Sequence, residues 1–110
     1  MDDGLTTSVD GEVLEEVVHR IVEVARPERI ILFGSGARGG LTKNSDLDLL
    51  VVKSGAHRRK LAQEIYVNLI GVGRSVDVVV VTPEDIGRFG DSPALVIEAA
   101  LREGVEVYAA

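Results

Sequence analysis

The order of its apolar segments constrains this chain more than any other feature. Four short runs of mostly branched aliphatic residues have the length of β-strands, and three longer segments repeat apolar residues at helical spacing. The expected strands are 29–33, 47–53, 75–81 and 105–108, and the expected helices are 11–25, 57–70 and 93–102. The resulting order, α-β-β-α-β-α-β, predicts a small mixed β-sheet with helices packed on it, an α/β (α+β) fold.

Residues that favour helix ends lie between these apolar segments. Asp10 is expected to cap the first helix, and Pro27 lies just beyond its end. Ser92 and Pro93 have the character of an N-cap and a first helical position. The other expected stops are Gly71 and Gly73 after the second helix, Thr82-Pro83 after the third strand and Gly104 after the last helix.

Length and composition favour one domain over residues 1–110. Val, Ile and Leu make up 36 of the 110 residues, enough to build a packed core. The chain has no cysteine, which excludes disulfides and thiolate chemistry and favours a cytoplasmic location. No apolar run is long enough to span a membrane, and the acidic start, Met1-Asp2-Asp3-Gly4, does not resemble a secretory signal.

The net charge of −6 argues against binding to bulk nucleic acid. The charge is uneven, however, because residues 36–74 carry 7 basic and 3 acidic groups while both flanking thirds are acidic. This central third is able to hold a small anion, although a chance distribution of solvated surface charge explains the pattern equally simply.

A glycine-rich turn, Gly34-Ser35-Gly36-Ala37-Arg38-Gly39, follows the first expected strand. It fits G-x-G-x-x-G, but a dinucleotide fold needs a crossover helix here, and residues 34–45 contain helix-breaking pairs instead. A P-loop is excluded because no Lys-Ser/Thr pair follows the glycines. Gly34 and the Ser35 hydroxyl can hold a phosphate beside the Arg38 cation. The alternative is an ordinary glycine turn.

Three aspartates open or interrupt the next two apolar strands. Asp46 and Asp48 are two residues apart, so on a strand their carboxylates point the same way, and Asp77 interrupts the run Val76–Val81. Carboxylates from two neighbouring strands can meet at one point, the geometry of a two-metal phosphoryl-transfer site. Solvated or singly satisfied aspartates are the simpler alternative.

Other polar or aromatic residues carry weaker signals. We expect His19 and Lys43 to be solvated surface groups and Tyr66 and Tyr108 to pack. The run His57-Arg58-Arg59-Lys60 opposes the dipole of the helix that it opens, so it can contact an anion, but a solvated face is the better interpretation.

The combined pattern resembles the minimal nucleotidyltransferases of the DNA polymerase β-like superfamily. The resemblance is carried by Leu32-Phe33-Gly34-Ser35, by Ser45-Asp46-Leu47-Asp48 and by Asp77 on a later strand, and it covers about residues 28–81 well. One departure is Gly36, where many relatives carry Arg or another larger residue.

The resemblance implies a polymerase β palm-like nucleotidyltransferase fold and a protein adenylyltransferase-like enzyme. Gly34, Ser35 and Arg38 would bind the nucleotide, and Asp46, Asp48 and Asp77 would be the catalytic residues and the ligands of two Mg²⁺ ions. AMP from ATP would go to a hydroxyl acceptor, namely a Tyr on a small helical HEPN-type toxin, so the chain would act as an antitoxin and could form an oligomer. The alternative is a catalytically weak module that neutralises a partner protein by contact.

Overall fold

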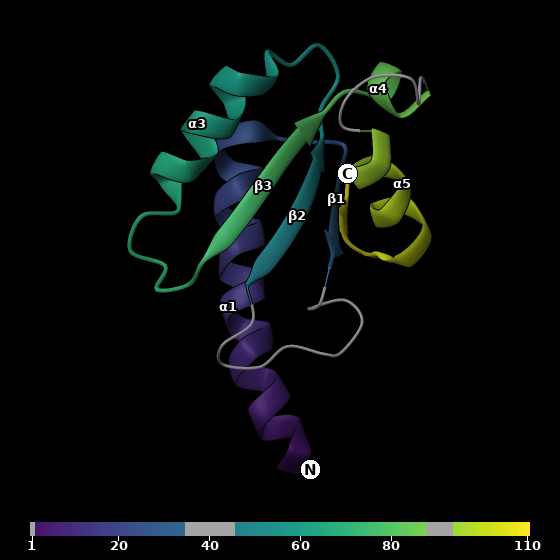
Figure 1. Ribbon diagram of the computed structural model, residues 1–110. Coiled ribbons are helices and arrows are strands. Elements are labelled where there is room, and N and C mark those ends of the chain that lie inside the picture. The colour runs from purple at the N-terminus through teal and green to yellow at the C-terminus, as the bar shows by residue number, and fades with distance from the viewer. Residues whose placement is uncertain (1, 35–45, 88–93) are drawn as a thin grey trace.

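The computed structural model describes residues 2–34, 46–87 and 94–110. Two layers of helices enclose one sheet (Figure 1). The helices are α1 (Asp2–Ala25), α3 (Arg58–Asn68), α4 (Pro83–Gly87) and α5 (Ala94–Glu103), and the strands are β1 (Arg29–Phe33), β2 (Leu47–Val52), β3 (Val76–Val81) and β4 (Val105–Ala109).

The sheet is mixed, as the order of segments predicts. Its strand order is β3-β2-β1-β4, with β2 and β3 parallel and both other pairs antiparallel. β4 lies at one edge, as expected for a short alternating strand, and β3 lies at the other. The register between β1 and β4 shifts at Ile30 and Ile31, a bulge that leaves Val107 without a partner in the ladder.

Each face of the sheet has its own apolar core, because successive strand residues point to opposite sides. On one face, Leu49 and its neighbours pack against Val17 and Ile21 of α1 and against Ile65 of α3. On the other face, Leu50 and Val81 pack against α5 through Ile97 and Ala100. The large branched aliphatic fraction of the chain therefore fills two thin layers rather than one centre.

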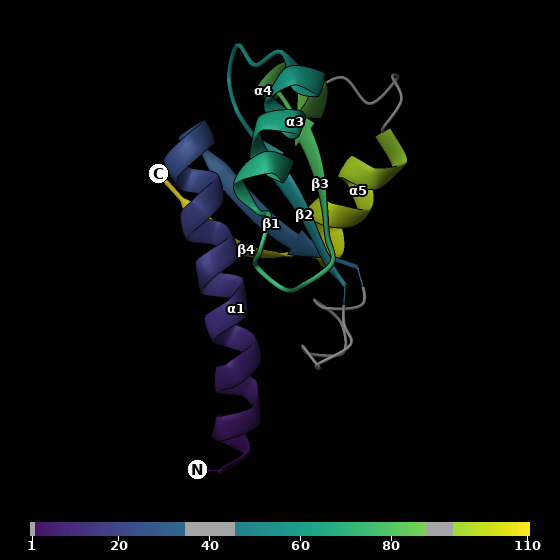
Figure 2. The same ribbon diagram turned by 90° about the vertical axis from the view of Figure 1, so that its left-hand side faces the viewer.

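Helix α1 is longer than the sequence pattern predicts. It begins at Asp2 rather than at residue 11, so the expected N-cap at Asp10 is wrong and Asp10 lies inside the helix. The segment before Gly11 contains no proline to stop the helix. In Figure 2 the N-terminal half of α1 runs past the end of the sheet.

Two other helix boundaries differ from expectation. His57 is the N-cap of α3, and its Nδ1 accepts a hydrogen bond from the backbone N–H of Lys60. Thr82-Pro83, expected only to stop a strand, instead opens the short helix α4. Thr82 and Asp85 cap that helix reciprocally: the Asp85 carboxylate accepts from the Thr82 N–H, and the Thr82 hydroxyl accepts from the Asp85 N–H.

Candidate active site

The candidate site lies at the end of the sheet where β1 finishes and β2 and β3 begin. Phe33, Asp48 and Asp77 form a row across three strands, because Phe33 pairs in register with Asp48 and Asp48 with Asp77. Asp48 alternates with Leu47 and Leu49, which are buried under α1 and α3, so its side chain belongs to the opposite face. Asp48 is half-buried, while Asp77 is exposed.

The electrostatics of the row centre on Asp48. Partial burial raises the pKa of the Asp48 carboxyl, and the charge of Asp77, a hydrogen bond with Asp77 and the charge of Asp46 raise it further. Asp46 lies just before β2 and is exposed. Three carboxyl groups therefore influence one another, and a cation placed among them would relieve their repulsion.

Gly34 brings the backbone directly against this row. It adopts a left-handed conformation, with φ of +78°, at the end of β1. A Cβ atom at this position would run into the Asp48 side chain, meeting its Oδ2 and lying 3.2 Å from its Cγ. Glycine is therefore required here both for its backbone angle and for space.

The donor set suits a hard divalent cation, since carboxylate oxygens are the ligands that Mg²⁺ prefers. Even so, no group of three or more His, Cys, Asp or Glu residues in the described part of the chain has the arrangement of a finished metal site. The three aspartates nevertheless supply ligands of the right chemistry.

The remaining predicted site residues fall in different places. Ser35 and Arg38 lie outside the described residues, as does Lys43. His19 is exposed, as expected, and its Nε2 lies 3.5 Å from the Glu23 carboxylate. Arg59 and Lys60 are exposed, in agreement with a solvated face, whereas Arg58 contacts an anion within the chain, pairing with the Asp85 carboxylate at 3.2 Å.

Two aromatic residues support the site in ways that the sequence pattern does not reveal. Phe33 flanks Asp48, although the apolar run showed it only as a strand residue. Tyr66, expected to pack, is 42% exposed, and its hydroxyl accepts a hydrogen bond of 2.8 Å from the backbone N–H of Val78, next to Asp77. Tyr108 does pack, against the core under α1.

The family model of the nucleotidyltransferase domain matches residues 12–107. No curated protein gives a significant match. No helix among the described residues is both long and apolar enough to cross a membrane.

Solved structures with the same fold include nucleotidyltransferases and a toxin–antitoxin complex. A Sulfolobus solfataricus protein assigned as a nucleotidyltransferase is 20% identical, with a TM-score of 0.63, over 94% of this chain and 84% of that one. A protein assigned as a minimal nucleotidyltransferase is 28% identical, with a TM-score of 0.58, over 86% and 92%. A chain from a toxin–antitoxin complex with AMP-PNP is 20% identical, with a TM-score of 0.56, over 87% and 73%.

Proposed function

Because this chain belongs to the nucleotidyltransferase domain family, we propose that it transfers AMP from ATP to a hydroxyl group on a partner protein. The observation that carries the proposal is the row in which Asp48 and Asp77 stand side by side, with the Gly34 backbone against Asp48. Such a row offers acidic ligands and an open backbone approach at one point, which is what transfer of a nucleotide requires.

Separate residues of the chain would bind the triphosphate, hold the metal ions and accept the proton. Gly34 and Ser35 would hold the triphosphate, with Arg38 balancing charge on the leaving group. Asp46, Asp48 and Asp77 would hold two Mg²⁺ ions, whose contribution when bound is to neutralise the triphosphate. Asp77 is exposed and therefore accessible to an incoming hydroxyl. It would accept the proton of that hydroxyl.

The transfer step is a substitution at the α-phosphorus. The acceptor oxygen forms a bond to that phosphorus, the bond to the oxygen bridging the α- and β-phosphates breaks, and pyrophosphate leaves with the electron pair. The proton released by the hydroxyl passes to Asp77. Positioning and charge neutralisation supply most of the rate enhancement in such reactions.

The acceptor that we propose is a tyrosine on a small helical toxin of the HEPN type, so that the chain acts as an antitoxin. The support is that one protein of the same fold belongs to a toxin–antitoxin complex with AMP-PNP, an ATP analogue. Transfer of AMP would add charge and bulk that block the partner's active site. The second candidate function, neutralisation by contact alone, would need no metal and no Asp77.

Labelled ATP tests the reaction class. The chain is incubated with Mg²⁺ and with a small helical protein of the HEPN type, and the ATP is labelled at either the α- or the γ-phosphate. We expect label from the α-phosphate alone to appear on the partner. Transfer from the γ-phosphate would identify a kinase instead, and transfer of neither label alongside neutralisation would favour the contact-only function.

A further inference from the structure

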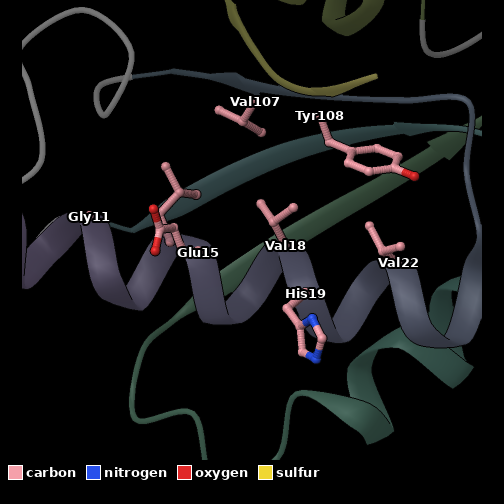
Figure 3. A pocket seen from close by; sticks show the side chains of 8 residues that line it. Gly11, Glu15, Val18, His19, Val22, Val107 and Tyr108 are labelled. Carbon is pink, nitrogen blue, oxygen red and sulfur yellow. The ribbon is translucent and has the colours of Figure 1, made fainter. Parts of the chain in front are cut away.

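A groove runs between α1 and the edge strand β4, on the face of the sheet opposite the aspartate row. Its first part has a volume of about 530 Å³ and is lined mainly by aliphatic side chains of α1 and by Val107 and Tyr108. In Figure 3, Val18 and Val22 point toward Val107 and Tyr108, while His19 points away from them. A second hollow shares Val22 and Tyr108 and continues to Arg26.

The two hollows together follow α1 from Gly11 to Arg26. At about 1.5 Å per residue, the distance along the helix from Gly11 to Arg26 is about 22 Å, the length of a helix of about 15 residues. The groove is therefore long enough for one amphipathic segment of another protein lying along α1.

The charge of the side chains around the groove indicates which kind of segment would dock there. Helix α1 contains seven acidic residues and one Arg. Among its described side chains, Glu15 lines the groove, and Glu12 and Glu23 are exposed. The Arg in the helix, Arg20, is turned toward α3, where it donates to the backbone oxygens of Asn68 and Ile70. The solvent-exposed flank of the groove is thus acidic along α1, its floor is apolar, and Arg26 places one cation at its far end.

The same charge argues against a second copy of this chain as the occupant. Two α1 helices laid together in a symmetric dimer would bring two acidic flanks into contact. A basic amphipathic segment would instead place apolar side chains on Val18 and Val107 and its cations opposite Glu12 and Glu15.

The N-terminal turns of α1 have a low intrinsic helix propensity. Residues 2–11 contain two Gly, two Thr, one Ser and three Asp, all weak helix formers. The first α1 residue with a buried side chain is Val17, within the described range 11–25. A helix end with such low propensity is marginal in water.

We propose that the groove between α1 and β4 is the docking site for a basic amphipathic segment of a partner protein. The part of α1 beyond the sheet extends past the end that carries the aspartate row (Figures 1 and 2). A partner along α1 therefore reaches that end without covering Asp48 or Asp77. The identification of this partner with the AMP acceptor rests on the proposed function, whereas the docking itself does not.

Gly11 provides a matched pair of variants for the test. It lines the groove, and a Cβ atom there meets nothing within 4 Å. Gly11→Trp should fill the groove, whereas Gly11→Ala adds only a methyl group and should leave docking intact. Both substitutions favour the helix, so loss of docking in the first cannot be attributed to unfolding.

The probe is a synthetic helical peptide of about 15 residues, built from Leu on one face and Lys on the other, with one Trp. The wild-type protein has no Trp, so the anisotropy of the peptide's own Trp reports docking to the wild type and to every variant without an added Trp. For Gly11→Trp a dye-labelled peptide replaces the Trp peptide. We expect Gly11→Trp to weaken docking about tenfold or more, and the double variant Glu12→Lys with Glu15→Lys to do the same.

The controls separate docking at the groove from general attraction to an acidic protein. A peptide of the same composition with its Leu residues scattered should bind weakly, and Glu64→Lys with Glu98→Lys should change little. Asp77→Asn should dock normally even if the proposed chemistry is absent. Equal affinity of Gly11→Trp and Gly11→Ala would overturn the proposal, as would a wild-type dimer that Gly11→Trp dissociates.

Discussion

Asp48 and Asp77 occupy the same register position on the parallel strands β2 and β3, and the hydrogen bond between them helps to raise the pKa of Asp48. Two carboxyl groups held side by side in a stable sheet oppose folding when both are ionised. A cation bound between them would convert this repulsion into binding energy.

Mg²⁺ together with a non-hydrolysable ATP analogue should raise the melting temperature of the protein. Ligand at 100 times its Kd stabilises the native state by about 2.7 kcal/mol, which is a shift of several degrees for a domain of this size. Differential scanning fluorimetry measures it. Asp46→Asn with Asp48→Asn should abolish the shift, and a double variant that responds as the wild type does would remove the aspartates from the metal site.

Without metal, Asp48 should make the protein less stable as the pH rises. Because the pKa of Asp48 in the folded protein lies above its unfolded value of about 3.8, the unfolded chain loses this proton first. The stability contributed by Asp48 is therefore greatest below pH 3.8 and falls as the pH rises toward the folded pKa. Asp48→Asn should raise the melting temperature at neutral pH and have less effect in acid.

Asp85 should behave in the opposite way and serves as the contrast. The backbone N–H of Thr82 is the main group that lowers the pKa of Asp85, with further help from the Thr82 hydroxyl and from Arg58. Its stabilising contribution is present above the unfolded pKa and is lost as the pH falls through the folded pKa. Asp85→Ala should cost about 1 kcal/mol of unfolding free energy at neutral pH and leave nucleotide binding unchanged in calorimetry.

Gly34→Ala should separate backbone strain from damage to the site. A side chain at a left-handed position costs about 1–2 kcal/mol, and here the new methyl group also displaces Asp48. Gly55→Ala is the matched control, since Gly55 has φ of +70° and open space around it. Both variants should lose stability in urea unfolding, Gly34→Ala more than Gly55→Ala because of its clash with Asp48, but only Gly34→Ala should lose nucleotide binding. Equal nucleotide binding by the two variants would contradict the close approach.

Tyr66→Phe should weaken the edge strand next to Asp77. It removes the hydroxyl that accepts from the Val78 N–H, and an unsatisfied backbone donor costs about 1–3 kcal/mol when it is buried. Val78 is only 8% exposed. Amide exchange at Val78 should accelerate in the variant, while exchange at the centre of β2 should change less. Unaltered exchange at Val78 would show that the hydroxyl contributes nothing to the strand.

The strands and the aspartate row were predictable because both depend on local spacing. Because strand side chains alternate between two faces, Asp48 is expected to share a face with Leu50. Asp77 stands out because it is a charged residue within an apolar run. Parallel pairing then places the two side by side. The pattern Thr82-Pro83-Glu84-Asp85 is also typical of a capped helix, but the helix that it opens is only five residues long, too short to show an apolar period.

Features that depend on tertiary contact were not predictable. The bond between Tyr66 and Val78 joins residues 12 apart through the packing of α3 on β3, and no local pattern encodes it. The placement of β4 beside β1, which creates the groove along α1, likewise depends on how the last helix crosses the sheet. Propensity also failed to predict the start of α1, because residues 2–10 are poor helix formers.

Intact-mass spectrometry of the partner protein tests the central claim most directly. A small helical protein of the HEPN type is incubated with Mg²⁺ and ATP in the presence of wild-type protein or of Asp77→Ala. We predict that the wild type adds multiples of the mass of an AMP group to the partner, and that Asp77→Ala adds none while still binding it. A partner that both proteins neutralise equally, with no change in mass, would contradict the account and leave neutralisation by contact.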